Sequence, residues 1–504
     1  MWARSCLTAL FFLSSSVLAA PSQTTVERQT GTLSQDPAGQ ALTFEYTTSH
    51  PFDTYWIGLY DASGGGPANE EYVAPSLVWS YAPGTPGTVT LSDDALEPGD
   101  YQAFFLAQDR YEWLAEPVNV TIEAPAADID FPVESATLHN ARQGDKYTAN
   151  IAGLVLGQSQ DTVIFTKVSG EDGINVSQDG LITGTPSSTS QVPAELTISA
   201  TASNGSNNTI RLTIPVRLKP QRLVSDLKVM SYNLWHGGAQ QLRFLLDSGA
   251  YVVAQQEASP DHAKRLGQAL GWHHYQSSGS VGVISRYPII EKYGQISASG
   301  GVRIDLNGGR DDDPVEINVW SAHLGYTPYG PYNFCFDNMT KEEVLAREAE
   351  SGRIPQITAI LDGIQSQLQE ADRVPVILAG DFNAPSHLEW VPSLQEKNCD
   401  NDSLDWPTSI LPTEHGLIDS FRVAHPDPAR EQATTWSPVF PKHNGATGRD
   451  EPQDRIDFVY HTEDRLRVIG SEHLIVGDPA PSPGHKENEW TSDHAAVLTH
   501  YELL

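Results

Sequence analysis

Basic residues are scarce in this chain of 504 residues. Lysine and arginine number 31 against 64 aspartates and glutamates, so the formal net charge is −33. Proteins that hold nucleic acid along many phosphates present a basic surface, and this balance weakens the case for that class. It does not exclude a nuclease, because a bound cation can dominate the electric field within a site.

Cysteine is also rare, with three residues in the chain. No cysteine and histidine cluster has the spacing of a structural zinc site, which excludes that kind of site. Cys6 falls in a segment that is predicted to be removed, so Cys335 and Cys399 remain. In an oxidising compartment this pair predicts one disulfide, with two buried free thiols as the alternative.

Long apolar runs are missing after the first twenty residues, and no later segment is long enough to cross a bilayer. Arg4 precedes an apolar stretch from Leu7 to Leu18, which Ala19 and Ala20 follow as small residues. This order predicts a signal peptide over residues 1–20 and a secreted, extracellular protein, with an uncleaved anchor as the alternative. Sequons for N-glycosylation fit secretion and begin at Asn119, Asn175, Asn204, Asn207, Asn338 and Asn401.

The first part of the mature chain contains short alternating strands that turn clusters interrupt. In residues 21–127, the run Tyr55–Tyr60 and the turn Pro83–Gly87 are examples, and they predict a β-sandwich module. Residues 128–219 predict a second sandwich, whose turn, strand and turn at Asp179–Pro186 resemble immunoglobulin-like or cadherin-like modules. Neither module concentrates catalytic residue types. We therefore expect spacers or modules packed on the following domain, with carbohydrate or wall binding as the alternative.

The pattern changes from residue 220, where apolar runs alternate with helical stretches. Continuous apolar runs such as Val374–Ala379 are typical of strands that are covered on both faces. A helix is predicted to begin near Thr340, because Thr340 and Glu343 fit a capping box, and Pro355 is expected to kink or divide it. This order predicts a layered α/β domain over residues 220–504.

Polar side chains of particular kinds follow the predicted strands of this domain. Each is weak evidence alone, because a single aspartate, asparagine or histidine at a strand end usually belongs to a turn. Together they combine carboxylates and amides, which suit a hard cation such as Mg²⁺, with histidines, which can move protons. The set comprises Asn233, Glu257, His323, Asp381, Asn383, Asp457, Asp493 and His494.

The ordered motifs around these residues resemble the endonuclease/exonuclease/phosphatase superfamily over residues 224–504. The motifs are Met230–Trp235, Gln256–Glu257, Val283–Pro288, Ala322–Leu324, Gly380–Asn383, Arg455–Asp457 and Ser492–His494. The resemblance implies a four-layer α/β sandwich of two β-sheets flanked by helices. It also implies in-line attack of water on phosphorus, in a group that includes pancreatic-type deoxyribonucleases, abasic-site endonucleases, inositol-polyphosphate 5-phosphatases and neutral sphingomyelinases.

The resemblance further implies a metal site. Glu257 is then the main ligand, Asn233 lies beside it, and Asp493 is close enough to help. The implied ion is Mg²⁺, with Mn²⁺ as the alternative. Because the chain is so acidic, a cation becomes a requirement for holding an anionic substrate.

Five further residues take catalytic roles by the same resemblance. Asp381 orients and deprotonates the attacking water, and Asn383 holds the phosphate. His494 contacts the scissile phosphate and is oriented by Asp457, while His323 assists the leaving oxygen.

Two points stay open within this resemblance. Asp454 also fits an Asp-Arg-Ile pattern of some members, although Asp457, before an aromatic strand, is the closer match. Tyr326, Tyr329 and Tyr332 either stack on a base, a sugar or a lipid head group, or pack their loop.

The sequence therefore predicts a secreted, metal-dependent phosphoester hydrolase, whether phosphodiesterase, nuclease or phosphatase. The substrate is open between nucleic acid, a phospholipid head group, a phosphoinositide and a small phosphodiester. No stable membrane insertion is expected, and glycan contact through the first two modules is a further expectation. The alternative is an extracellular glycan-binding or wall-binding protein with a vestigial catalytic domain.

Overall fold

The computed structural model describes residues 30–36, 42–92, 96–122, 128–157, 163–187, 192–235, 240–258, 261–432, 434–443 and 448–504. The predicted signal peptide lies outside these residues. The chain divides into two compact units, residues 1–125 and residues 126–504. Among the described residues, no helix combines the length and the apolar character that crossing a bilayer requires.

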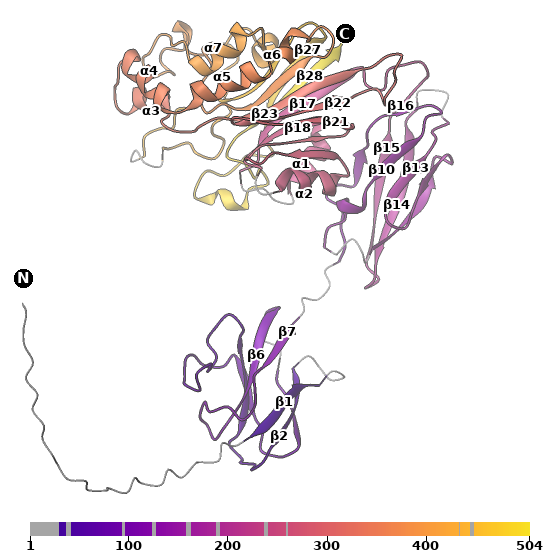
Figure 1. The fold of residues 1–504 in the computed structure, drawn as a ribbon, viewed down its shortest axis with the longest axis vertical. Coiled ribbons are helices and arrows are strands. Elements are labelled where there is room, and N and C mark those ends of the chain that lie inside the picture. Colours follow the sequence, from indigo (N-terminus) through magenta and orange to yellow (C-terminus); the bar gives the residue numbers. More distant parts are fainter. Residues whose placement is uncertain are drawn as a thin grey trace, which may run out of the picture. The chain divides into compact units, whose positions relative to one another are not determined.

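The first unit contains two antiparallel sheets that enclose an apolar core (Figure 1). Their strand orders are β1-β2-β5 and β4-β3-β6-β7. In β2, Phe44 and Tyr46 are buried while Glu45 between them is exposed, as alternation in a half-covered strand requires. The strands are β1 (Gly31–Gln35), β2 (Thr43–Thr48), β3 (Trp56–Asp61), β4 (Val78–Tyr81), β5 (Gly87–Thr90), β6 (Gly99–Leu106) and β7 (Val118–Ile122).

The second unit begins with the second module, which is also built from strands. Its sheets have the orders β11-β14-β15-β8, β10-β13-β12 and β16-β9. The all-β character predicted for both modules is confirmed, whereas an immunoglobulin-like arrangement stays a prediction. The elements are β8 (Ser135–Thr137), β9 (Ala141–Arg142), β10 (Tyr147–Asn150), η1 (Ala152–Leu154), β11 (Val163–Gly170), β12 (Ile174–Val176), β13 (Leu181–Gly184), β14 (Ala194–Ala202), β15 (Asn207–Ile214) and β16 (Val216–Arg217).

The α/β domain contains two six-stranded sheets that face each other, with the orders β19-β20-β18-β17-β28-β27 and β21-β22-β23-β24-β26-β25. Between them, Val229 and Val252 of the first sheet pack with Val319 and Ile377 of the second. The strands are β17 (Asp226–Asn233), β18 (Val252–Gln256), β19 (His273–Gln276), β20 (Gly282–Ser285), β21 (Ile289–Ile296), β22 (Ser299–Asp305), β23 (Glu316–His323), β24 (Val376–Asp381), β25 (Ile418–Asp419), β26 (Asp457–His461), β27 (Leu466–Leu474) and β28 (Ala496–Leu503).

Helices cover the outer faces of this pair of sheets (Figure 1). In α5, Ile357, Ile360 and Leu361 pack on Trp320 and Leu378 of the second sheet, and α1 and α2 cover the first sheet. The domain therefore has the four layers that the sequence predicted. The helices are α1 (Gln240–Ser248), α2 (His262–Leu270), α3 (Gly330–Cys335), α4 (Lys341–Glu350), α5 (Arg353–Gly363), α6 (Gln365–Gln369), α7 (Pro407–Glu414), α8 (Ser420–Ala424), η3 (Pro392–Leu394) and η4 (Gly484–Glu487).

The helix predicted from Thr340 begins as expected but divides at another place. Thr340 and Glu343 form the predicted capping box of α4. The helix is interrupted at Gly352, whose φ of 80° is left-handed, and Pro355 lies inside the first turn of α5. The expectation that Pro355 causes the break was therefore wrong, because a proline in a first turn lacks only an N–H that has no helical partner.

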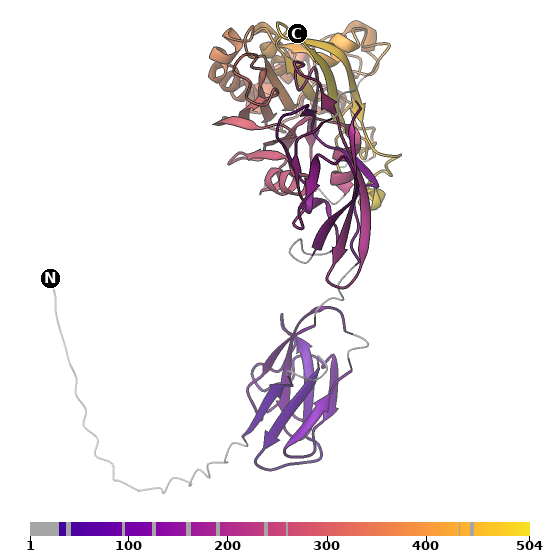
Figure 2. The ribbon, with the colours of Figure 1, turned by 90° about the vertical axis from the view of Figure 1, so that its right-hand side faces the viewer.

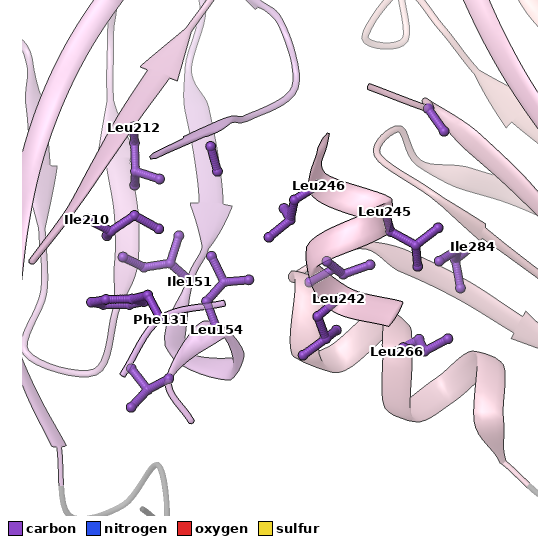
Figure 3. Packing of buried hydrophobic residues seen from close by; sticks show 14 of the residues in the cluster. Phe131, Ile151, Leu154, Ile210, Leu212, Leu242, Leu245, Leu246, Leu266 and Ile284 are labelled. Atoms are coloured by element: carbon purple, nitrogen blue, oxygen red, sulfur yellow. The ribbon is translucent and has the colours of Figure 1, made fainter. Parts of the chain in front are cut away.

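The second module packs directly on the side of the α/β domain that carries α1 and α2 (Figures 1 and 2). Ile151 and Leu154 of the module belong to the same apolar cluster as Leu246 of α1 (Figure 3). The backbones approach closely, since a Cβ atom added to Gly153 would lie 2.6 Å from Cα of Ala269. The module is therefore a covering layer of the α/β domain and not a spacer.

Candidate active site at the edge of the two sheets

Three polar side chains form a row across the second sheet. The parallel pairing of β23 with β24 places His323 opposite Asp381. The antiparallel pairing of β24 with β26 places Asp381 opposite Asp457. Strand register therefore brings residues that are far apart in the sequence to one edge of the sheet.

The first sheet contributes two side chains at the same edge. Asn233 ends β17, and Glu257 follows β18, which lies parallel to β17. Nδ2 of Asn233 donates hydrogen bonds to Oε1 of Glu257 at 3.3 Å and to Oδ2 of Asp381 at 3.1 Å. The strand ends of the two sheets thus meet at Asp381.

His494 lies between two buried carboxylates. Its Nδ1 is 2.8 Å from Oδ2 of Asp457, and its Nε2 is 3.8 Å from Oδ2 of Asp381. Burial disfavours the charged ring, but Asp457 and Asp381 outweigh it and raise the pKa of His494 to about 10. Oγ of Ser492 accepts from the backbone N–H of His494 and donates to the carbonyl of Asn233, which fixes the segment against β17.

Asp381 is the point of convergence. Burial raises its pKa above the ordinary value, while His494 opposes that shift. Asn383 donates from its backbone to Oδ1 at 2.8 Å and from its side chain to Oδ2 at 3.2 Å. Nε2 of His323 lies 3.6 Å from the same Oδ2, and its Nδ1 lies 3.2 Å from Oγ of Ser280. A carboxylate held by so many groups has one orientation.

Two of the site residues adopt left-handed backbone conformations. The φ angle is 53° at Glu257 and 51° at Asn383. Such values are uncommon for residues other than glycine, and they gather at functional sites, where they aim side chains that a regular strand would direct elsewhere. Both side chains line the cavity described below.

The predicted ligand residues fit a hard cation. Oδ1 of Asp493 is buried and has no hydrogen-bond partner among the described residues. Burial raises the pKa of Asp493 to about 6, with His494 opposing the shift and Glu257 adding to it. Crowded carboxylates without a partner are unfavourable unless a cation compensates them. Glu257, Asp493 and Asn233 offer the oxygen ligands that Mg²⁺ prefers.

Among the described residues, a different trio also brings potential ligand atoms close together. One atom each of Asp381, Asp457 and His494 lies within 4.8 Å of the others. The imidazolium form of His494 donates from both ring nitrogens and therefore cannot bind a metal. In this trio His494 is hydrogen-bonded to Asp457 and lies near Asp381, beside the predicted ligands.

A cavity of about 260 Å³ opens over these groups. No lysine or arginine of the described chain lines it. The polar lining residues are Glu257, His323, Asp381, Asn383, Asp493 and His494, and the aromatic ones are Trp235, Tyr326, Tyr329, Tyr332 and Trp436. The cavity therefore offers ring faces around a polar floor.

The tyrosines after His323 divide between the two alternatives. Tyr326 is 73% exposed at the cavity and is available for stacking. Tyr329 donates to Oδ2 of Asp454 at 2.9 Å, and Tyr332 donates to Oε1 of Glu451 at 2.6 Å. Their hydroxyls therefore anchor the loop. Asp454 pairs with Tyr329, whereas the carboxylate that contacts His494 is that of Asp457, the assignment preferred from the sequence.

Three neighbours of the site carried no sequence signal. Oγ1 of Thr435 accepts from the backbone N–H of Asp457 at 3.1 Å, and the ring of Trp436 lies 5.0 Å from that of His494. Ser280 holds His323, as described above. These residues stand in segments without a motif or a regular period, so only the fold reveals them.

The fold and this geometry define a layered α/β domain with a buried carboxylate and histidine site at the edge shared by its two sheets. The profile of the Endonuclease/Exonuclease/phosphatase family matches residues 230–494, and the chain belongs to this family. An uncharacterized protein of Caenorhabditis elegans is 32% identical over 306 residues, which are 56% of this chain and 92% of that protein.

Two solved structures are also similar. An AP endonuclease from Archaeoglobus fulgidus is 15% identical, with 54% of this chain and 98% of that chain covered and a TM-score of 0.35. The 3'-5' exonuclease NExo from Neisseria meningitidis is 18% identical, with 55% and 99% covered and a TM-score of 0.35.

Proposed function

We propose that the chain is a secreted hydrolase that uses Mg²⁺, or Mn²⁺ as the alternative, to cleave phosphoesters with water. The observation that carries this proposal is the convergence on Asp381. Asn233, Asn383, His323 and His494 all lie within 4 Å of its Oδ2. Such an arrangement holds a base, a cation and hydrogen-bond donors around one small volume.

The proposed roles follow from the contacts. Asp381, whose pKa is raised by burial, orients the attacking water and takes its proton. His494, held charged by Asp457, donates from Nε2 to a phosphate oxygen and offsets developing negative charge. Asn383, beside Asp381, contributes its amide to holding the phosphate, and His323, whose side chain is 19% exposed, protonates the leaving oxygen.

Glu257, Asn233 and Asp493 would hold the cation, which when bound supplies positive charge to the phosphoryl oxygens. In this structure Nδ2 of Asn233 donates to two carboxylates, and its Oδ1 accepts from the backbone N–H of Trp235. As a ligand, Asn233 would turn its amide so that the oxygen faces the cation. The proton transfers and the binding of the phosphate are assigned to the side chains already described.

The test is a panel of DNA, RNA, sphingomyelin, inositol phosphates and a generic phosphodiester, each with Mg²⁺ and with chelator. We expect cleavage of at least one substrate that chelator abolishes and that Asp381→Ala and His494→Ala lose. A matched control is Glu342→Ala, which changes an exposed acidic residue of α4 that does not line the cavity. Full activity in either site variant would reject the assignment.

The cavity lining bears on the substrate. It holds no basic side chain among the described residues, so it offers no run of phosphate contacts like those of proteins that follow a nucleic-acid backbone. Its rings suit a base, a sugar or a lipid head group beside the phosphate. A compact phosphodiester or phosphomonoester is therefore favoured over a long duplex.

Secretion has two supporting observations. Cys335 and Cys399 form a disulfide with a Cα–Cα distance of 5.3 Å, which is typical of oxidising compartments. The sequon asparagines are exposed except Asn401, whose half-buried amide donates to two carbonyls. Expression in a secreting eukaryotic host should give glycans at the exposed sequons and none at Asn401. A chain retained in the cytosol without glycans would contradict secretion.

The second candidate is an extracellular glycan-binding or wall-binding protein with a vestigial catalytic domain. The two β-rich modules favour it, whereas the complete set of site residues counts against it. Glycan-array or cell-wall binding without cleavage of any substrate in the panel would establish it.

A further inference from the structure

The outer face of the β4-β3-β6-β7 sheet in the first module carries a hollow of about 370 Å³. Three of the rings that line it are exposed, Tyr72 by 60%, Trp79 by 53% and Tyr81 by 44%. Exposed aromatic side chains that gather around a hollow mark binding sites more often than chance exposure. Trp56, Tyr111 and Asp109 also line the hollow.

Strand pairing explains why the rings gather there. In the antiparallel ladder, Trp56 of β3 lies opposite Tyr81 of β4, and Gly58 lies opposite Trp79, so all three aromatic side chains share one face. A Cβ atom at Gly58 would lie 2.6 Å from the ring of Trp56. The glycine thus lets this ring lie over the strand, where Nε1 donates to the carbonyl of Arg110 at 3.1 Å.

The ring of Trp56 forms the base of the hollow, and neighbouring rings form its sides. The rings of Trp79 and Tyr111 each stand at 81° to that of Trp56, with centroids 6.1 Å and 5.8 Å away. The ring of Tyr81 stands at 82° to that of Trp79. Rings that stand nearly perpendicular to one another direct several π faces toward one volume. That geometry suits a compact cation.

The negative charge of the first module also favours a cation. Residues 30–122 contain thirteen acidic residues and one basic residue, Arg110. Asp109 lies at the hollow, where it accepts a hydrogen bond from Oη of Tyr81 at 3.1 Å. No lysine or arginine of the described residues lines the hollow. An anionic ligand would meet repulsion here, whereas a cation is attracted by the carboxylate of Asp109.

We propose that this aromatic hollow binds an alkylated ammonium group, such as the trimethylammonium of choline, through the faces of Trp56, Trp79 and Tyr111 and the carboxylate of Asp109. The methyl groups fill the space between the rings, and the charge is attracted by the π faces and by Asp109. This binding site is independent of the hydrolytic site and of the proposed function.

The experiment is calorimetric titration of the full chain with choline and with 3,3-dimethylbutan-1-ol, its uncharged analogue of the same shape. We expect saturable binding of choline and an affinity for the alcohol that is lower by about tenfold or more, because the alcohol lacks the charge. Trp79→Ala should weaken choline binding by about tenfold or more, and Asp109→Asn should weaken it while keeping an acceptor for Tyr81.

The matched control is Phe52→Ala, which removes an exposed aromatic ring outside the hollow and should leave choline binding unchanged. Circular dichroism and the unfolding temperature identify any variant that fails to fold, and Asp109→Asn then serves as the gentler test. The cavity of the α/β domain also has aromatic walls, so choline binding that persists unchanged in folded Trp79→Ala would overturn the proposal. Equal affinity for the alcohol, absence of saturable choline binding, or binding of oligosaccharides instead of choline would also overturn it.

Discussion

His494 and Asp457 are joined by a 2.8 Å contact between Nδ1 and Oδ2 that connects the two sheets of the α/β domain. Asp457 begins β26 of the second sheet, and His494 stands just before β28 of the first. The position of the histidine therefore depends on how the sheets pack and not on either sheet alone. At this pair, the packing of the two sheets directly determines the position of a proposed catalytic side chain.

Asp457→Asn should lower kcat by roughly 10²- to 10⁴-fold, because the amide no longer stabilises a charged His494. KM should change little, since Asp457 does not line the cavity. Steady-state kinetics on the best substrate of the panel measure both. The control is Asp454→Asn, which alters a buried carboxylate that contacts Tyr329. If Asp454→Asn proves the more damaging change to kcat, the assignment of the pair is wrong.

Glu257→Gln should weaken divalent-cation binding by roughly 10- to 100-fold, because the amide keeps the shape and removes the charge. Binding of Mn²⁺ can be followed by electron paramagnetic resonance without substrate, so this measurement does not depend on turnover. Glu350→Gln is a suitable control, since its carboxylate is exposed and pairs with Arg347. Unchanged Mn²⁺ affinity in Glu257→Gln would exclude this residue as a ligand.

His461 should make the α/β domain sensitive to acid. Its side chain is 2% exposed with Nδ1 2.8 Å from Oγ of Ser420, and burial lowers its pKa to about 4, although a bond to the carbonyl of Ile418 opposes the shift. The unfolded chain binds this proton near pH 6.5, so stability is complete above that pH and falls as the pH drops toward 4. By pH 5, protonation of His461 in the unfolded chain lowers the free energy of unfolding by about 2 kcal/mol.

The measurement is urea unfolding of the wild type and of His461→Asn between pH 7.5 and 4.5, chosen because asparagine places a polar atom near the position of Nδ1. We expect the pH slope of the unfolding free energy to be shallower in the variant. Equal slopes in the two proteins would show that His461 does not take up a proton on unfolding.

Removal of the second module should be far more damaging than removal of the first. The first unit has its own core, so a chain of residues 126–504 should fold. A chain of residues 220–504 would expose the faces of α1 and α2, where each buried leucine such as Leu242 or Leu246 contributes about 2 kcal/mol. Soluble yield and unfolding temperature compare the two truncations. A stable, monomeric 220–504 chain would contradict the shared core.

Local patterns in the sequence predicted the strands and the residues at their ends. The run before Asp381 and the capping box at Thr340 are signals of neighbouring residues, and both are confirmed. The break at Gly352 was missed because proline disrupts a helix more strongly than glycine does. Pro355 does not disrupt α5, because it lies in the first turn of that helix.

Contacts between distant segments could not be predicted from one sequence. Nothing near Trp436 indicates that its ring meets His494, and nothing near Gly153 indicates an approach to Ala269. These contacts depend on topology and on side-chain volumes at remote positions, which leave no period or spacing in the chain.

The close approach of Gly153 to Ala269 has a thermodynamic consequence for the active site. Ala269 belongs to α2, which packs against α1, and α1 lies in the chain between Asn233 and Glu257. A cation that binds Asn233 and Glu257 in the folded state also stabilises every segment that must be folded to bring these two residues together. Saturating Mg²⁺ should therefore raise the unfolding temperature of the second module, although none of the expected ligands lies in it. A large side chain at position 153 should weaken Mg²⁺ binding from a distance by the same linkage.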